Sequence, residues 1–192
     1  MASVYHPPEL TALHRQALLE LARQAIAEYL KTRRVPKHQT GDPALLQPSG
    51  AFVTLWRRGE LRGCIGHIDA DMPLCRAVQQ MAVAAAVNDP RFPPVEEEEL
   101  GDIEAEINIL SPLAPVASAD EIEVGKHGLM ITKGIYRGLL LPEVAVERKW
   151  DRYEFLEAVC WKAGLPPGAW REGATLQTFT SVIIKQNLKS ES

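Results

Sequence analysis

The sequence has few of the features that mark a membrane, secreted or metal-binding protein. It contains three cysteines, Cys64, Cys75 and Cys160, and no Cys-x-x-Cys pair. An odd and sparse set of this kind argues against a disulfide framework and a four-ligand zinc site, and it is typical of a reducing compartment. No stretch approaches the roughly 18 apolar residues of a membrane span, and residues 1–8 lack the regions of a signal peptide. We therefore expect a cytoplasmic protein without a membrane segment, metal or cofactor.

Basic residues are absent from residues 92–125, which carry ten acidic side chains. The whole chain has 21 Lys and Arg against 25 Asp and Glu, a net charge of -4. This balance argues against the broad basic surface of a general nucleic-acid binder. The simplest interpretation of the acidic stretch is a solvated face that keeps the protein soluble. The alternative is a surface that docks a basic or cationic partner.

The 192 residues, 46% of them hydrophobic, suffice for one large domain or two small interlocked ones, without a cross-link. Apolar residues at helical spacing predict a helix from Leu10 to about Arg34, and residues 36–50, which lack periodicity, predict a loop. Strict alternation from Ile103 to Ile109 predicts a half-buried strand with one acidic face.

Two hairpins are expected, one from residues 51–56 and 60–68 and one from residues 129–132 and 138–141. Asp71 with Pro73 is expected to begin a second helix, and Asp151 with Glu154 a third. Residues 175–185 are rich in Thr, Val and Ile and predict a last strand. Hairpins in place of regular βαβ alternation favour an α+β fold with mostly antiparallel sheets flanked by helices.

The unusual segment is Leu61-Arg62-Gly63-Cys64-Ile65-Gly66-His67. Glycines inside a strand weaken packing and usually permit a close approach of other groups. On a regular strand Arg62 and Cys64 point to the same side, about 7 Å apart at the backbone, and Gly66 leaves space beside the sulfur. A neighbouring cation favours the thiolate, which is the nucleophilic and metal-binding form. The alternative is that Cys64 packs as a small apolar residue.

Two further groups are candidates for proton transfer. His127 lies between Gly125 and Gly128 in a predicted loop, where it would act as a general base or cap the loop. Glu106 lies on the polar face of its strand, where it would accept a proton, orient Arg62 or remain a solvated carboxylate.

Asp89 and Arg91 flank Pro90, so they either tie a turn together or place Arg91 beside Arg62 as an anion clamp. His67 follows Cys64 at a spacing that suits a metal, but no second ligand pair follows. On an unbroken strand His67 would face away from Cys64, unless a bulge at Gly66 turned it round.

These residues lie in a segment that resembles the Leu-Arg-Gly-Cys-Ile-Gly signature of the AMMECR domain family. The other blocks that resemble this family follow in order, as Asp89-Pro90-Arg91-Phe92-Pro93, Glu106-Ile107 through Leu110-Ser111-Pro112, Gly125-Lys126-His127-Gly128-Leu129, Gly138-Leu139-Leu140-Leu141-Pro142, and Trp150-Asp151 with Phe155-Leu156 and Cys160. The resemblance implies a single domain over residues 8–186, built from two unequal, tightly associated α+β subdomains. Residues 1–7 and 187–192 are then flexible termini.

The resemblance also implies the bacterial description AmmeMemoRadiSam system protein A, with Memo-like and radical S-adenosylmethionine proteins as partners. We expect a cysteine-dependent enzyme or enzyme subunit that acts on a small or nucleotide-like substrate. The alternative is a non-catalytic adaptor that uses the signature as a groove and residues 92–125 as an acidic docking surface. The catalytic candidates are Cys64, His127 and Glu106, and the substrate-binding candidates are Arg62, Gly63, Gly66, His67, Asp89 and Arg91.

Overall fold

The computed structural model describes residues 8–37 and 40–185, so the termini expected to be flexible lie outside it. Backbone contacts divide the chain into two units. The larger unit is formed by Pro8–Leu110 together with the chain from Val182, and the smaller unit by Ser111–Ser181. Both combine helices with antiparallel strand pairs, which confirms the predicted α+β class. No helix in the described ranges is both long and apolar enough to cross a bilayer.

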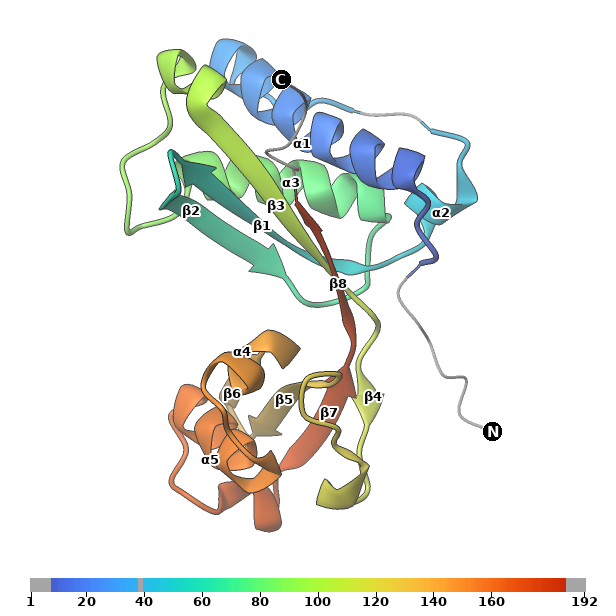
Figure 1. The fold of residues 1–192 in the computed structure, drawn as a ribbon, viewed down its shortest axis with the longest axis vertical. Helices are drawn as coiled ribbons and strands as arrows, with labels where there is room; N and C mark the ends of the chain where they lie inside the picture. The colour runs from blue at the N-terminus through green and yellow to red at the C-terminus, as the bar shows by residue number, and fades with distance from the viewer. Residues whose placement is uncertain (1–7, 38–39, 186–192) are drawn as a thin grey trace. The chain divides into compact units, whose positions relative to one another are not determined.

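The larger unit is a four-stranded sheet with helices on one side (Figure 1). Its strands lie in the order β2-β1-β3-β8, and β1 is antiparallel to both β2 and β3. The elements are α1 (Ala12–Thr32), α2 (Pro43–Leu46), β1 (Gly50–Arg57), β2 (Glu60–His67), α3 (Leu74–Val87), the 3-10 helix η1 (Glu97–Asp102), β3 (Ile103–Leu110) and β8 (Ser181–Lys185).

One face of this sheet holds the core of the larger unit. Leu18 of α1, Val78 of α3, Val53 of β1 and Ile107 of β3 are fully buried in a single hydrophobic cluster. Helices α1 and α3 therefore cover the same face, as their apolar periodicity requires. Side chains that alternate with the core positions point to the other face, which we call the Cys64 face. It includes Phe52, Thr54 and Trp56 of β1, Cys64 of β2, and Glu104 and Glu106 of β3.

A β-bulge interrupts β2 at Arg62. Leu55 pairs with Gly63 but Trp56 pairs with Leu61, so Arg62 has no direct partner on β1. Since paired residues share a face, Leu61 joins Cys64 on its face and Arg62 is displaced from the alternation. The expectation that Arg62 and Cys64 project side by side from a regular strand is wrong for this reason.

The smaller unit has its own antiparallel sheet, with the strand order β4-β7-β5-β6. Its core gathers Ile131 of β5 and Phe155, Leu156 and Val159 of α5, all fully buried. The elements are β4 (Ala114–Pro115), the 3-10 helix η2 (Ala119–Glu121), β5 (Gly128–Lys133), β6 (Tyr136–Leu140), α4 (Pro142–Glu147), α5 (Arg152–Lys162), the 3-10 helix η3 (Ala169–Arg171) and β7 (Thr175–Phe179).

Local structure departs from the sequence-based expectation at three places. The loop predicted for residues 36–50 contains α2, which Asp42 caps by accepting a hydrogen bond from the Ala44 amide. Helix α3 has no side-chain cap, because Asp71 bonds to His67 and not to the start of the helix. Helix α4 was not expected, although Pro142 stands at its start, where proline is favoured.

The single strand predicted for residues 175–185 is two strands that belong to different sheets. The break falls at Thr180, whose amide donates to Ser111 Oγ at 2.9 Å while its carbonyl accepts from the Ser111 amide at 2.9 Å. Thr180 is thus fastened to the residue where the chain first passes from the larger unit to the smaller. The β-favouring composition continues across this junction, so it could not reveal the change of sheet.

A substitution at Gly63 tests how closely α3 packs on β2. A Cβ at position 63 would lie 2.1 Å from the backbone oxygen of Ala85 in α3, whereas a Cβ at Gly101 would meet nothing within 4 Å. We predict that Gly63→Ala lowers the free energy of unfolding by about 3 kcal/mol through overpacking, and that Gly101→Ala changes it by less than about 1 kcal/mol. Urea denaturation followed by circular dichroism measures both. Equal stability of the two variants would contradict the close approach of helix and strand.

Candidate functional site

Cys64 is the half-exposed cysteine of the chain, whereas Cys75 and Cys160 are buried. Its direct neighbour across the β1–β2 hairpin is Thr54, whose hydroxyl donates to Cys64 Sγ at 3.2 Å. The register of β1 and β3 places Glu106 on the other side of Thr54. Lys185 of β8 completes the row, because its Nζ lies 3.0 Å from Glu106 Oε2. The Cys64 face therefore presents a thiol, a hydroxyl, a carboxylate and an ammonium group on successive strands.

The backbone of Cys64 is bonded to the segment that follows α3. Strand β2 is at the edge of its sheet, and the Cys64 amide donates to Asp89 Oδ2 at 2.8 Å. The Asp89 side chain is only 2% exposed. Arg91 donates to both Asp89 oxygens, from Nε at 2.9 Å and from Nη2 at 2.7 Å. Asp89 thus satisfies a backbone donor of the edge strand and holds a guanidinium group beside it.

The ion pair between Asp89 and Arg91 shifts the pKa of both groups. Its hydrogen bonds hold the pKa of Asp89 well below the usual range for a carboxyl group. Asp89 raises the pKa of Arg91 in return, and the charge of Cys64 acts in the same direction. The side chain of Arg91 is 55% exposed, so its guanidinium is accessible to a ligand as well as paired.

Arg62 is engaged elsewhere. Its Nε and Nη2 each bond to Glu99 at 2.9 Å, and its Nη1 donates to the carbonyl of Pro93 at 2.9 Å. The Arg62 side chain is 12% exposed. Arg57 adds a second ion pair to Glu99 at 2.8 Å. Arg62 and Arg91 consequently belong to separate ion pairs, and Arg62 fastens the chain that leads into η1.

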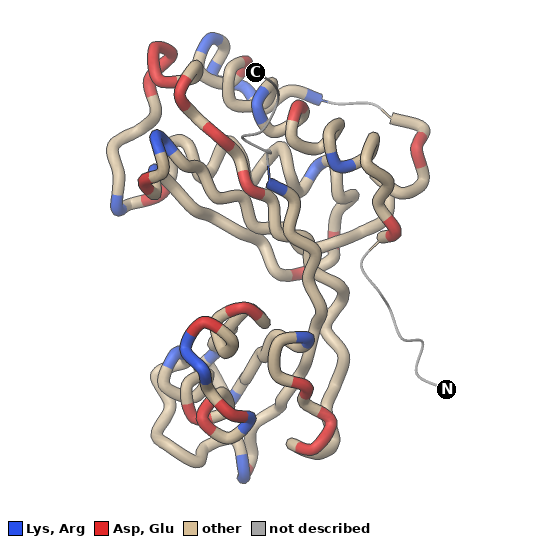
Figure 2. Tube along the Cα trace, in the orientation of Figure 1, with Lys and Arg blue, Asp and Glu red and all other residues tan. Residues whose placement is uncertain are grey.

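These contacts join the first two sequence blocks into one structural unit. Cys64 is bonded to Asp89, and Arg62 to Pro93 and Glu99, so the segment from residue 89 to residue 99 runs along the edge of β2. We call it the edge segment. Figure 2 shows the acidic residues that continue from its end through η1 into β3. The edge segment covers a strand edge that would otherwise expose unpaired backbone groups.

Close packing leaves no room for a side chain at either glycine of the signature. Gly63 lies against Ala85, and a Cβ at Gly66 would lie 2.0 Å from the ring of Phe52. The space that Gly66 was expected to leave beside the sulfur is therefore filled by an aromatic ring. This ring lies on the strand next to Cys64 and supplies an apolar wall on the Cys64 face.

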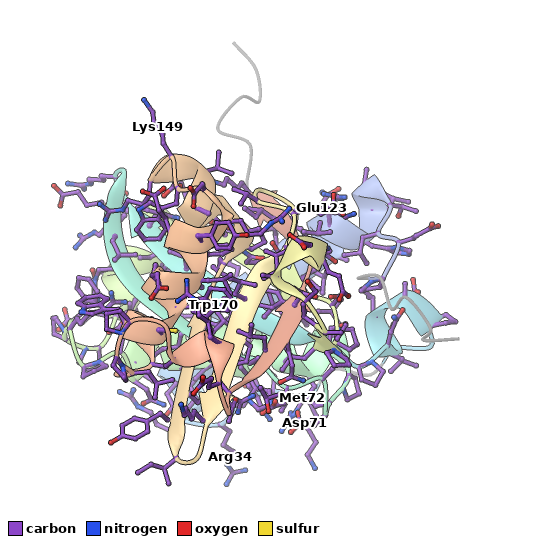
Figure 3. The ribbon with its side chains drawn as sticks, turned by 90° about the horizontal axis from the view of Figure 1, so that it is seen from below. Arg34, Asp71, Met72, Glu123, Lys149 and Trp170 are labelled. Carbon is purple, nitrogen blue, oxygen red and sulfur yellow. The ribbon has the colours of Figure 1, made fainter. Side chains whose placement is uncertain are left out.

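Neither candidate histidine contacts Cys64. His67 pairs with the core-facing Ala51, so it lies on the opposite face of β2, and its Nε2 is 2.7 Å from Oδ1 of Asp71, labelled in Figure 3. His127 belongs to the smaller unit, where its Nδ1 accepts from the amide of Glu123, also labelled in Figure 3, at 3.1 Å. Burial lowers the pKa of His127, and the charge of Lys126 adds to this effect.

No group of three or more His, Cys, Asp or Glu side chains gathers as a metal site within the described ranges. Sequence reasoning missed Thr54, Glu99 and Phe52. The first and last follow from the hairpin register once the bulge is known, because Thr54 and Phe52 stand opposite Cys64 and Gly66. The role of Glu99 depends on a contact with Arg62 across 37 residues and has no local signal.

The fold and the site define an α+β protein of two units in which a half-exposed thiol lies on a sheet beside a fastened edge segment. The AMMECR1 family model matches residues 19–184, and the chain belongs to the AMMECR1 family.

Similar proteins occur in archaea. A Pyrococcus furiosus protein is 45% identical over 181 residues, which cover 88% of this chain and 86% of the relative. A Methanosarcina barkeri protein is 44% identical over 186 residues and 92% of each chain. The crystal structure of an uncharacterized Pyrococcus horikoshii protein has a TM-score of 0.78 at 44% identity, covering 87% of this chain and 88% of that one.

Glu99 makes the edge segment sensitive to acid. Hydrogen bonds from Arg62 lower the pKa of Glu99 to about 2, against about 4.3 in an unfolded chain. Its stabilising effect is therefore complete above about pH 4.3 and is lost as the pH falls toward 2. We predict that Glu99→Gln destabilises the protein by about 3 kcal/mol at pH 7, and that this difference disappears on acidification.

The measurement is urea denaturation at a series of pH values. Asp102→Asn is the control, because Asp102 pairs with the well-exposed Arg58 and such pairs contribute less than about 1 kcal/mol. A Glu99→Gln deficit that stays constant down to pH 2 would show that the carboxylate charge does not hold the edge segment.

Proposed function

We propose that Cys64 is the reactive group of this protein, and that it acts as a nucleophile on a small electrophile that carries an anionic group. The chain would then work as a cysteine-dependent enzyme or enzyme subunit. The observation that supports this most strongly is that Asp89 accepts a hydrogen bond from the amide of the half-exposed Cys64 and also binds the accessible guanidinium of Arg91. Reactive cysteines lie in electropositive, partly exposed surroundings of this kind.

Thr54 supports the same role. Its hydroxyl donates a hydrogen bond to Cys64 Sγ at 3.2 Å. Thr54 orients the sulfur without touching a substrate, so it is a positioning residue. Glu106 lies on the same face next to Thr54, is held by Lys185, and is the proposed proton acceptor.

Arg91 supplies the proposed contact with substrate. Asp89 accepts from its Nε and Nη2, and within the part of the chain that the structure describes Nη1 donates no hydrogen bond. An anionic group bound at Nη1 would hold an attached electrophile close to the thiol and so raise its effective concentration. Gly63, Gly66 and Arg62 contribute by shaping the strand and fastening the edge segment.

Alkylation with two matched reagents tests this proposal. Iodoacetate and iodoacetamide transfer similar groups, but only iodoacetate carries a carboxylate. We predict that Cys64 is alkylated at neutral pH while Cys75 and Cys160 are protected by burial. We also predict that the rate ratio of iodoacetate to iodoacetamide exceeds that of free cysteine by about fivefold, the effect of about 1 kcal/mol of attraction to Arg91.

Variants distinguish the effect of the Arg91 charge from an effect of the substitution on folding. Arg91→Gln should abolish the preference for iodoacetate, Arg91→Lys should keep part of it, and Arg58→Gln, at an exposed ion pair of the same unit, should leave it unchanged. Thr54→Val should slow both reagents alike, and Thr54→Ser should restore the rate. Peptide mass spectrometry reads out each rate. Alkylation of Cys64 no faster than free cysteine, with no reagent preference, would refute the proposal.

We further propose Memo-like and radical S-adenosylmethionine proteins as partners, with the acidic residues 92–125 as the docking surface in the adaptor alternative. Much of this acidity is already paired, since Glu99, Asp102 and Glu106 bind Arg62, Arg58 and Lys185. Glu97 and Glu98 are exposed and remain suited to docking.

Binding assays with the purified partner candidates distinguish the two roles. If the protein is an adaptor, the double variant Glu97→Lys with Glu98→Lys should weaken binding at least tenfold, while Cys64→Ser retains binding and cellular activity. If Cys64 is catalytic, Cys64→Ser should abolish activity without weakening binding. The charge reversal must leave Glu99 unchanged, because that residue holds the edge segment.

A further inference from the structure

Two aromatic residues of β1 flank the thiol on the Cys64 face. Phe52 and Trp56 belong to this face, because they alternate with buried core residues of the same strand. Thr54 stands between them and is the residue directly opposite Cys64. Residues on the same face of a strand are about 7 Å apart. The thiol therefore has one aromatic residue on each side of it along the direction of the hairpin.

The residues opposite the two aromatic side chains bring apolar surface close to the sulfur. Gly66 is opposite Phe52, and a Cβ at Gly66 would lie 2.0 Å from the Phe52 ring, so the ring occupies the place where a side chain would begin. Gly66 is two residues after Cys64 on the same face of β2, which makes the ring a neighbour of the sulfur. Leu61 is opposite Trp56 and is 36% exposed, so it adds apolar surface on the other side.

Neither aromatic side chain is fully buried. Antiparallel strands with one solvated face carry polar side chains on that face, and β3 does so with Glu104 and Glu106. Strand β1 differs, because Phe52 and Trp56 are two of the three side chains that it places on the Cys64 face. Ligand sites are lined mainly by aromatic and apolar side chains with a few polar groups among them. The surroundings of Cys64 have this composition.

We infer that the substrate of Cys64 carries a planar aromatic ring, which packs against Phe52 and Trp56, in addition to the anionic group that Arg91 binds. This inference rests on the function proposed above and names its class of substrate, an aromatic anion with an electrophilic carbon close to the ring. Aromatic pairs prefer offset-stacked or edge-to-face contacts, which give them an attraction beyond that of an apolar group of equal area. Phe52 and Trp56 are thus specificity-determining residues that select the electrophile.

Reaction of the full chain with N-phenylmaleimide and N-cyclohexylmaleimide tests the inference. The two reagents are similar in size, but only the first carries a planar ring. In both reactions the thiolate sulfur of Cys64 bonds to one carbon of the maleimide double bond, the π bond breaks, the other carbon takes a proton from water, and no group leaves. We predict that the rate ratio of phenyl to cyclohexyl reagent at Cys64 exceeds that of free cysteine by about fivefold. Peptide mass spectrometry measures the rates.

Variants at the aromatic positions locate the effect. Phe52→Leu and Trp56→Leu should each lower the rate ratio, and the double variant should lower it to that of free cysteine. Phe52→Tyr retains a ring and should retain the ratio. Tyr29→Leu is the control, because Tyr29 is a half-buried aromatic residue of α1, on the side of the sheet opposite to Cys64 (Figure 1), and it should leave the ratio unchanged.

Two results would overturn the inference. One is a phenyl-to-cyclohexyl ratio at Cys64 no larger than that of free cysteine. The other is a raised ratio that persists in the double variant while circular dichroism shows this variant to be folded; if it does not fold, the two single variants decide in the same way. The preference of Cys64 for iodoacetate is a separate readout. If that preference remains, only the aromatic contact is wrong, and if Cys64 reacts with none of the reagents, both proposals are wrong.

Discussion

The structure of the larger unit depends on how the edge of β2 is closed. An edge strand exposes unpaired backbone groups, and here the edge segment covers them through the Cys64 amide bond to Asp89 and the Arg62 pair with Glu99. Both acidic side chains are nearly buried, and both have arginine partners that keep them ionised. The edge segment thus combines strand protection with a fixed position for Arg91, and the environment of the thiol follows from that position.

The residues of the signature therefore have two different roles, one in packing and one in chemistry. Arg62, Gly63 and Gly66 build the strand, through the bulge, the contact with Ala85 and the space for the Phe52 ring. Cys64 is the member with a nucleophilic side chain, which is half-exposed and accepts a hydrogen bond from the hydroxyl of Thr54. Invariance of the whole motif would not by itself imply catalysis, because most of its residue types are explained by packing. The chemical argument concerns a single sulfur and the guanidinium that Asp89 presents to it.

The sequence predicted those features that local periodicity determines. The long helix, both hairpins, the acidic strand and the capped start of α5 at Asp151 are all confirmed. It missed those that depend on distant contacts. The bulge at Arg62 changes the face that a charged side chain occupies, and the partner of that side chain is Glu99, far along the chain. The break at Thr180 is set by Ser111 across 69 residues. Alternation predicts which face of a sheet a side chain points to, but only where no bulge displaces the residue from the alternation.

Helix α3 links the core of the larger unit to the strand that carries Cys64. The Ala85 carbonyl leaves no room for a side chain at Gly63, the residue next to Cys64. Helix α3 is therefore in close contact with the strand that carries the thiol. The same packing that makes Gly63 intolerant of alanine makes β2 respond to any movement of α3, since a close-packed contact of backbone against backbone has no flexible side chain to absorb it.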